Sequence, residues 1–168
     1  MKITWFGGRT LRVHIGGQII VLDPRGRSAE TGHAEVVSGA DQLVEWGGPY
    51  REVDPRTWRP RRSSLRDEDD RQPVEVLLIG FEARLIDAVG EPPLVLMGTI
   101  EGAGNWSRDA VVVAYSEDAA LAALNVLGPR LVALALPEGK VEPVFSKLSN
   151  LLDGTTLVAL EPGLALEV

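Results

Sequence analysis

The sequence predicts an α/β fold, and three features support this prediction. The first 23 residues alternate apolar and polar side chains in three short runs separated by glycines, which is typical of an antiparallel meander. After residue 73, strand-like and helix-like segments alternate, as in parallel strands joined by crossover helices. The run at 131–136 is almost continuously apolar, as buried parallel strands are.

The N-terminal meander is expected to contain three strands. Their ranges are 1–6, 11–15 and 19–22. Gly16-Gly17 is a two-residue hairpin signal between the second and third strands. Asp23-Pro24 ends the third strand, because proline cannot donate to the hydrogen-bond ladder of a central strand.

From residue 74 onward we expect strands and helices in turn. The expected strands cover 74–79, 94–97, 110–115, 131–136, 155–160 and 164–167. The expected helices cover 81–89, 119–127 and a segment that starts near Pro143 and ends at Gly154. Ser116 is the expected N-cap of the second helix and Gly128 its left-handed stop. The last two strands flank a Pro162-Gly163 turn.

Residues 24–73 lack this regularity. The stretch 51–72 contains seven arginines and six acidic residues. We interpret 51–72 as a charged, flexible loop within a single domain of residues 1–168. The alternative is a lid that grips an anion over a site, because loops of this length are either functional or disordered. The arginines available for that grip are Arg59, Arg61 and Arg62.

Composition excludes several classes of site and partner. The chain has no cysteine, which removes disulfides, thiolate nucleophiles and cysteine-ligated metals and fits a cytoplasmic location. Its net charge of −7 and pI near 4.9 disfavour nucleic-acid binding. No apolar run approaches the roughly 18 residues of a membrane span, and we expect no signal peptide, because the opening MKITWF lacks the long apolar core of one.

The two ends of the chain resemble a known family. MKITWFGGRTLRVHIGGQIIVLDP resembles the start of small metallo-β-lactamase superfamily proteins, with a strand that usually ends in Gly-His, a hairpin, and a strand that ends in Asp-Pro. LVALEPGLALEV resembles their closing hairpin. The resemblance implies an αββα sandwich of two packed sheets flanked by helices. Members usually have a longer middle section, so we expect a trimmed sandwich here.

The zinc-binding signature of that family is His-x-His-x-Asp-His, followed later by two histidines and a bridging Asp. Such ligands hold Zn²⁺ and lower the pKa of its bound water to roughly 7. This sequence has only two histidines, His14 and His33, whereas the family's binuclear site takes four or five. Gly7-Gly8 stands where the family has Gly-His. The resemblance therefore implies a member that lacks the metal motif and holds no zinc.

A remnant of the ligand loop can be aligned at 34–43, which is expected to run as a strand and a loop. Gly39 stands near a ligand histidine, Asp41 falls on the motif Asp, and Gln42 falls on its last His. The alignment needs a gap of about two residues.

Asp23, Asp41 and His33 are the candidate catalytic residues. Asp23 ends a central strand, where sites of α/β folds occur, although Asp-Pro is also an ordinary strand stop. Asp41 is a candidate because it falls on the motif Asp in the remnant alignment, and His33 could act as a general acid or base. The two carboxylates could hold Mg²⁺ or Ca²⁺, and this predicts that they converge within about 5 Å of each other around the ion. His14 alternates with Val13 and Ile15 and is expected at the surface.

Two other features have plainer interpretations. The glycine-rich segment 98–104 lacks the Gly-Lys-Ser/Thr of a phosphate-binding loop and is expected to be a turn. No serine lies in a Gly-x-Ser-x-Gly elbow, so a hydrolase triad is not expected. Trp46 and Trp58 are the two tryptophans that could line a pocket or a partner surface.

We therefore predict a non-catalytic metallo-β-lactamase-like protein, a binding or interaction module with no cofactor or metal. The alternative is a metal-dependent hydrolase with a reworked, carboxylate-rich site that uses a divalent cation. A third possibility is an unrelated α/β domain. We also expect a homo-oligomer, a symmetric dimer in which a second copy covers an exposed sheet edge or apolar face.

Overall fold

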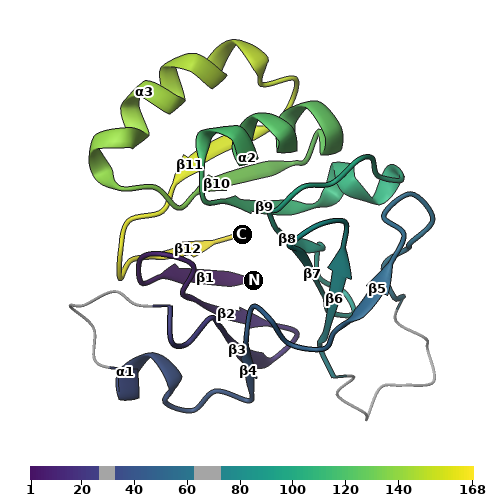
Figure 1. The fold of residues 1–168 in the computed structure, drawn as a ribbon, viewed down its shortest axis with the longest axis vertical. Helices are drawn as coiled ribbons and strands as arrows, with labels where there is room; N and C mark the ends of the chain where they lie inside the picture. Colours follow the sequence, from purple (N-terminus) through teal and green to yellow (C-terminus); the bar gives the residue numbers. More distant parts are fainter. Residues whose placement is uncertain (27–32, 63–72) are drawn as a thin grey trace.

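The computed structural model describes residues 1–26, 33–62 and 73–168. In these residues the strands form two sheets that pack face to face (Figure 1). The strand order is β12-β1-β2-β3-β4 in the five-stranded sheet and β11-β10-β9-β8-β7-β6-β5 in the seven-stranded sheet. The expected pair of packed sheets is therefore confirmed.

The five-stranded sheet contains the predicted N-terminal meander. Its strands are β1 (Lys2–Trp5), β2 (Leu11–Ile15), β3 (Gln18–Leu22), β4 (Gln42–Val44) and β12 (Ala165–Glu167). β1, β2 and β3 pair antiparallel, β4 lies parallel to β3, and β12 lies antiparallel to β1. Gly16 and Gly17 turn the chain between β2 and β3 with φ of 55° and 72°, which glycine adopts without strain.

The seven-stranded sheet contains the predicted parallel region. Its strands are β5 (Arg51–Val53), β6 (Glu75–Ile79), β7 (Ala83–Asp87), β8 (Leu94–Leu96), β9 (Val111–Ala114), β10 (Leu131–Leu134) and β11 (Thr156–Ala159). β8, β9, β10 and β11 are parallel to one another. β7 is antiparallel to both β6 and β8, and β5 is parallel to β6.

Helices lie on the outer sides of the two sheets. The helical segments are α1 (His33–Val37), the 3₁₀ turn η1 (Asn105–Asp109), α2 (Glu117–Ala122), the π turn η2 (Ala123–Leu127), α3 (Glu138–Leu148) and the 3₁₀ turn η3 (Ser149–Leu151). Figure 1 shows α2 and α3 over β9, β10 and β11, whereas α1 lies beyond β3 and β4. The layers therefore follow the expected αββα order.

Two hydrophobic cores hold the layers together. On β9, Val111 and Val113 face the core between the sheets, whereas Val112 and Ala114 face the core beneath the helices. This alternation follows from the period-two geometry of a strand. Both faces of β9 are buried, which explains why its sequence is continuously apolar.

The caps of the second helix follow the prediction. The Ser116 hydroxyl accepts a hydrogen bond from the Ala119 N–H at 3.1 Å, as an N-cap does. Gly128 ends the π turn with φ of 53°, a left-handed conformation that favours glycine.

The predicted helix over 81–89 is wrong, because this segment contains β7. Gly80 and Glu82 have φ of 63° and 56°, and they reverse the chain so that β7 pairs with β6. All five residues of β7 are buried, because the strand lies between two sheet neighbours and two cores. A short run that is buried on both faces has no clear period, so local pattern cannot separate strand from helix.

Two further segments differ from expectation, and a third lies outside the described residues. Residues 51–53 form β5 where a loop was expected, and 63–72 lie outside the described residues. Residues 34–37 form part of α1, where the remnant alignment implied a strand. The strand at 51–53 is tertiary in origin, because β5 is three residues long and is stabilised by pairing with β6.

The last helix and the last two strands also differ. α3 begins at Glu138, so Pro143 lies inside the helix and not near its start. Val144 and Leu148 are buried as expected, but Leu151 is exposed. β11 and β12 belong to different sheets, so they do not form a closing hairpin. The chain crosses between the sheets there because each strand finds a partner already in place, β10 and β1 respectively.

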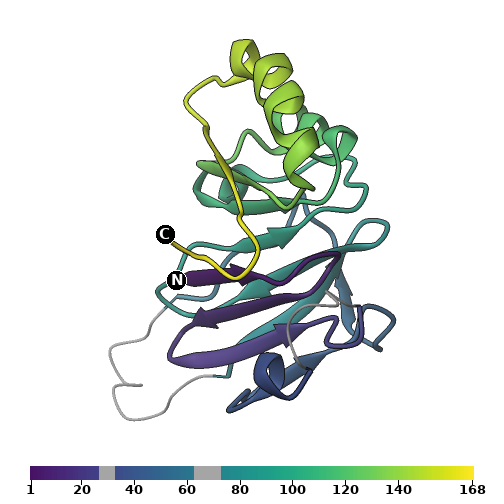
Figure 2. The same ribbon diagram turned by 90° about the vertical axis from the view of Figure 1, so that its left-hand side faces the viewer.

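The two chain ends meet on β1 and β12. Figures 1 and 2 both show the termini side by side, and the Val168 N–H donates to the Met1 carbonyl at 2.9 Å. Among the described residues, no helix has the length and apolar character needed to cross a membrane.

Candidate functional site

The loops that follow the parallel strands gather at one edge of the sandwich. β3 and β4 run in the same direction, as do β8 to β11, and ligands of α/β proteins bind beyond the carboxyl ends of such strands. Two contacts join the sheets at this edge. Arg9, after β1, lies 3.8 Å from the Glu82 carboxylate, and the Arg84 guanidinium donates to the Trp46 carbonyl.

Five side chains from this edge form what we call the strand-end cluster. They are Arg9, Trp46, Tyr50, Arg84 and Tyr115. Trp46 and Tyr50 follow β4, Tyr115 follows β9, and Arg84 is on β7. Trp46, Tyr50 and Tyr115 also pack against the core between the sheets.

Arg84 is placed by the alternation of β7. Its neighbours Ala83 and Leu85 face the core beneath the helices, whereas Ile86 faces the core between the sheets. Arg84 shares the side of Ile86, and only 5% of the residue is exposed. Its guanidinium donates to two backbone carbonyls, those of Ala83 at 3.3 Å and Trp46.

Aromatic rings surround the two guanidinium groups. The Arg9 and Arg84 guanidinium carbons lie 4.7 and 5.0 Å from the centroid of the Trp46 ring. Arg84 is also 5.7 Å from the Tyr50 centroid. Trp46 and Tyr115 meet edge to face with centroids 6.1 Å apart. Such cation–aromatic contacts each stabilise by roughly 0.5–2 kcal/mol, more when water is excluded.

Burial sets the protonation of these groups. Burial raises the pKa of Tyr115 above its usual value, and the Asp23 charge acts in the same direction while Arg9 opposes it. Burial also lowers the pKa of Arg84, an effect that Tyr50 and Glu82 oppose and Arg9 reinforces. Arginine nevertheless stays charged. The cluster therefore presents a phenol that keeps its proton beside fixed positive charge.

The structure separates Asp23 from Asp41. The Asp23 N–H donates to the Val44 carbonyl at 2.8 Å, which places Asp23 level with Glu45 at the carboxyl end of β4. Asp41 precedes β4, where its carboxylate accepts from the Ile19 N–H at 2.7 Å. Asp41 and Glu45 are four positions apart along the strand, or roughly 13 Å at about 3.3 Å per residue. The two carboxylates therefore do not converge as the hydrolase alternative requires.

His33 begins α1, and its side chain lies outside what the structure describes. His14 is exposed on β2, as expected. Gln42 donates to the Val74 carbonyl at 3.2 Å, which is a structural contact between the sheets. Gly39 has φ of 66° in the turn before β4.

The donors at this edge do not fit the zinc of the fold family. Across residues 1–26, 33–62 and 73–168, no three His, Cys, Asp or Glu side chains are grouped so as to hold a metal ion. Gly7 and Gly8, at the end of β1, have φ of 93° and 54°. The side chains that fill the edge are instead guanidinium groups, an indole and phenols, of which neither the guanidinium groups nor the indole is a usual ligand for Zn²⁺.

Two of the three arginines proposed as an anion grip, Arg59 and Arg61, have other partners. Arg61 donates to the buried Asp87 carboxylate at 2.6 Å and to the Asp87 and Pro73 carbonyls. Asp87 ends β7 at the edge opposite the strand-end cluster. Arg59 donates to the carbonyls of its own turn. Arg61 and Pro73, which flank the 63–72 segment, therefore lie at the edge opposite the cluster, and the lid stays a prediction because 63–72 lies outside the described residues.

Trp46 and Trp58, the two tryptophans that could line a pocket or a partner surface, lie in different parts of the molecule. Trp46 belongs to the strand-end cluster, whereas Trp58 packs edge to face on Trp106 at 5.0 Å in the core beneath the helices. The 98–104 segment makes a close backbone crossing, because a Cβ on Gly98 would lie 2.4 Å from the Phe81 carbonyl. That crossing is consistent with the expected turn.

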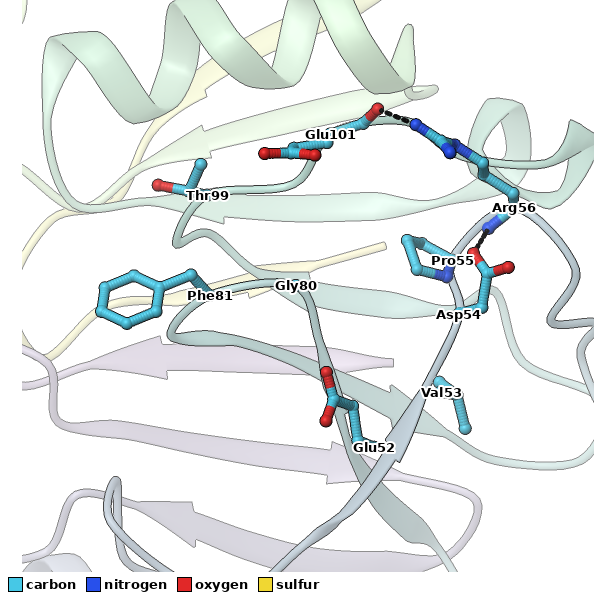
Figure 3. Close-up of a pocket in the computed structure, with 9 residues that line it drawn as sticks. All are labelled: Glu52, Val53, Asp54, Pro55, Arg56, Gly80, Phe81, Thr99 and Glu101. Carbon is cyan, nitrogen blue, oxygen red and sulfur yellow. Dashed lines mark hydrogen bonds between the residues drawn. The ribbon is translucent and has the colours of Figure 1, made fainter.

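A cavity of about 600 Å³ lies beside the cluster, across the β6–β7 turn. Its lining includes three carboxylates, Glu52, Asp54 and Glu101, and the exposed Phe81 ring. Figure 3 shows Phe81 and Arg56 at opposite sides of this lining. Arg56 donates through its backbone N–H to the Asp54 carboxylate at 2.9 Å and through its guanidinium to the Glu101 carbonyl at 3.0 Å.

Sequence reasoning singled out Trp46 but missed Arg9, Tyr50, Arg84 and Tyr115. The available signal was Arg84, which with Asp87 is one of two charged residues in the five-residue run Ala83–Asp87. A charge in a doubly buried strand demands an explanation, but the helix assigned to this segment would have placed it on a solvated face.

Comparisons with known proteins agree on the fold. No protein-family model matches this sequence, and no curated protein matches it. An isothiocyanate hydrolase from Delia radicum gut bacteria is similar in structure, with 9% identity and a TM-score of 0.59 over 99% of both chains. A putative zinc-dependent hydrolase of the metallo-β-lactamase superfamily from Thermotoga maritima has 13% identity and a TM-score of 0.51 over 96% of this chain and 99% of that one. A metallo hydrolase from the hyperthermophilic archaeon Ignicoccus hospitalis has the same identity and TM-score over 99% and 98%.

Proposed function

We propose that this chain is a non-catalytic binding module built on its metallo-β-lactamase-like fold. One observation carries the proposal. The edge where the parallel strands end is filled by the buried Arg84 guanidinium and the Trp46 and Tyr115 rings, where a hydrolase would need metal ligands. The absence of cysteine fits a reducing compartment, and we place the protein in the cytoplasm.

Electrostatics supports this proposal. A divalent cation roughly 5 Å from a guanidinium is repelled by about 7 kcal/mol at an effective dielectric constant of about 20. Arg84 and Arg9 are both within 5.0 Å of the Trp46 ring, so they impose this cost on a cation held at the ring. The carboxylate that pairs with Arg9 at this edge is that of Glu82, which is half exposed and so is screened by solvent.

The test is the metal content of untagged protein purified without chelators, measured by elemental mass spectrometry. We expect less than about one-tenth of an equivalent of zinc, iron or manganese, because a structural or catalytic site would retain its metal through purification. Near-stoichiometric metal together with ester or lactam hydrolysis would overturn the proposal.

A second candidate is a metal-dependent hydrolase with a carboxylate-rich site. It is favoured by the hydrolases among the structural neighbours. Glu52, Asp54 and Glu101 line one cavity but are not grouped so as to hold a metal ion in this structure, so an added ion would have to draw them together. This candidate predicts hydrolysis that depends on added Mg²⁺ or Mn²⁺, because these ions favour oxygen ligands. It also predicts that Glu101→Gln abolishes this hydrolysis. Hydrolysis unaffected by Glu101→Gln, or no hydrolysis at all, would exclude this cavity as the catalytic site.

A further inference from the structure

Arg84 is a buried charge without a charged partner. Buried guanidinium groups are normally paired with carboxylates, because an unpaired charge loses its hydration without compensation. Within the described residues, no carboxylate lies within 4.0 Å of the Arg84 guanidinium, and its Nε–H has no acceptor. The backbone carbonyls of Ala83 and Trp46 are its only hydrogen-bond acceptors in this part of the chain.

Two neighbouring donors lack acceptors too. The Trp46 indole N–H and the Tyr115 hydroxyl are buried without a hydrogen-bond partner among the described residues. Burial keeps Tyr115 protonated, since it raises the pKa of the phenol. Buried polar atoms are rarely left unpaired, and each such group in a folded protein calls for an explanation. All three unpaired groups can donate, so what the cluster lacks is an acceptor.

Nearby carboxylates do not supply it. Glu82 pairs with Arg9 at 3.8 Å, and both of these side chains are about half exposed, so the pair is weak. The Asp23 carboxylate lies against Gly26, where an added Cβ would clash with it. Arg9 brings a second positive charge to the same Trp46 ring, and an anion between the two guanidinium groups would relieve their repulsion.

We propose that the strand-end cluster binds the oxyanion group, a carboxylate or a phosphate, of a small molecule. Arg84 is its charge partner, the Trp46 N–H and the Tyr115 hydroxyl are further donors, and Arg9 contacts it from the solvent side. The half-buried faces of Trp46 and Tyr50 receive an apolar or planar remainder of the ligand. This inference rests on the proposed binding function and names the ligand class.

The experiment measures binding of two probes, benzoate and inorganic phosphate, by calorimetry and by two-dimensional NMR of the full chain. We expect at least one probe to bind and to shift the Trp46 indole resonance. Arg84→Met should weaken binding at least about tenfold, since a hydrogen bond to a charged group is worth a factor of roughly 10–100. Preference for benzoate would identify a carboxylate ligand, and preference for phosphate a phosphorylated one.

Two further variants keep the test interpretable. Tyr115→Phe removes one unpaired donor and no described hydrogen bond, so it should fold normally and weaken binding about threefold to tenfold. Arg130→Met, an exposed arginine at the start of the β10 region on the opposite edge, should bind as the unmodified protein does.

The inference would be overturned if neither benzoate nor phosphate binds. It would also be overturned if the unmodified protein, Arg84→Met and Tyr115→Phe bind the probe with equal affinity. The proposed function fails separately, through stoichiometric metal and hydrolysis. If the protein contains no metal and binds neither probe, only the assignment of an oxyanion ligand is contradicted, and the proposed non-catalytic function is not.

Discussion

Arg61 and Arg84 show two outcomes for a guanidinium inside this molecule. Arg61 has the buried Asp87 carboxylate at 2.6 Å and two backbone carbonyls as acceptors. Arg84 has two carbonyls and aromatic faces but no described carboxylate partner. An ion pair offsets part of the free energy that burial of a charge costs. We therefore expect Arg61 to stabilise the fold and Arg84 to bind a ligand that supplies the missing negative charge.

The role of Arg61 can be tested by its removal. Arg61→Met leaves the Asp87 carboxylate, which is 1% exposed, without its guanidinium. We expect the free energy of unfolding to fall by about 3–5 kcal/mol, measured by urea denaturation. The control is Arg51→Met, because its pair with Glu75 is exposed and should contribute less than about 1 kcal/mol. Equal losses in the two variants would contradict a structural role for the buried pair.

His14 gives a prediction of pH dependence. His14 is exposed, but the part of its ring that the protein covers loses hydration, which lowers its pKa below 6.5, and Arg12 and Lys2 add repulsion of the imidazolium. The unfolded chain then binds a proton more readily than the folded one, so stability is unaffected above pH 6.5 and falls as the pH decreases below it. The NMR titration midpoint of His14 should lie below 6.5, and His14→Gln should remove part of the loss of stability in acid. A midpoint above 6.5 would contradict this environment.

At the scale of elements, the β6–β7 turn decides the geometry of the candidate site. Gly80 and Glu82 have positive φ, and Phe81 forms an isolated bridge with Thr99. This turn directs Phe81 to the cavity and Glu82 to Arg9. It also sets which side of β7 carries Arg84. A helix over the same residues would have produced none of these contacts.

The turn can be tested with two glycine substitutions. Gly80→Ala places a Cβ 2.4 Å from the Thr99 carbonyl oxygen at a φ of 63°, so we expect a loss of at least about 2 kcal/mol of stability. Gly139→Ala, in the first turn of α3 with open space around its Cβ, should gain about 0.5–1 kcal/mol. Thermal denaturation measures both, and a loss in Gly139→Ala as large as in Gly80→Ala would contradict the steric argument.

At the scale of the molecule, the open edges of the sheets bear on assembly. β12 is an edge strand of the five-stranded sheet, and Leu164, just before it, is 61% exposed. Unpaired strand edges favour pairing with another chain, and two-fold dimers are the commonest assemblies.

We therefore expect a symmetric dimer through β12, seen by light scattering as twice the 18.1 kDa chain mass. Leu164→Lys should shift it toward monomer. The control Leu43→Lys, on the edge strand β4 at the other end of the same sheet, should leave it dimeric. A monomer at about 50 μM unmodified protein would contradict this expectation, since stable specific interfaces persist well below that concentration.

The sequence alone identified most of the strands of this fold, whereas the αββα order of the layers was implied by the family resemblance. Alternation identified the meander, continuous apolar runs identified the parallel strands, and Ser116 and Gly128 marked the ends of one helical segment. These signals are local, because a strand or a cap depends on a few consecutive residues. The count of two histidines also predicted, without any coordinates, that the chain lacks the binuclear zinc site of the family it resembles.

Only the tertiary structure decided the candidate site. Arg9, Trp46, Arg84 and Tyr115 follow or belong to four different strands and meet because two sheets close over one another. β7 became a strand because β6 and β8 were available on either side, and this fixed the direction of Arg84. Contacts between residues distant in sequence carry no local period, so the unpaired guanidinium at the strand ends could be found only once the sheets were in place.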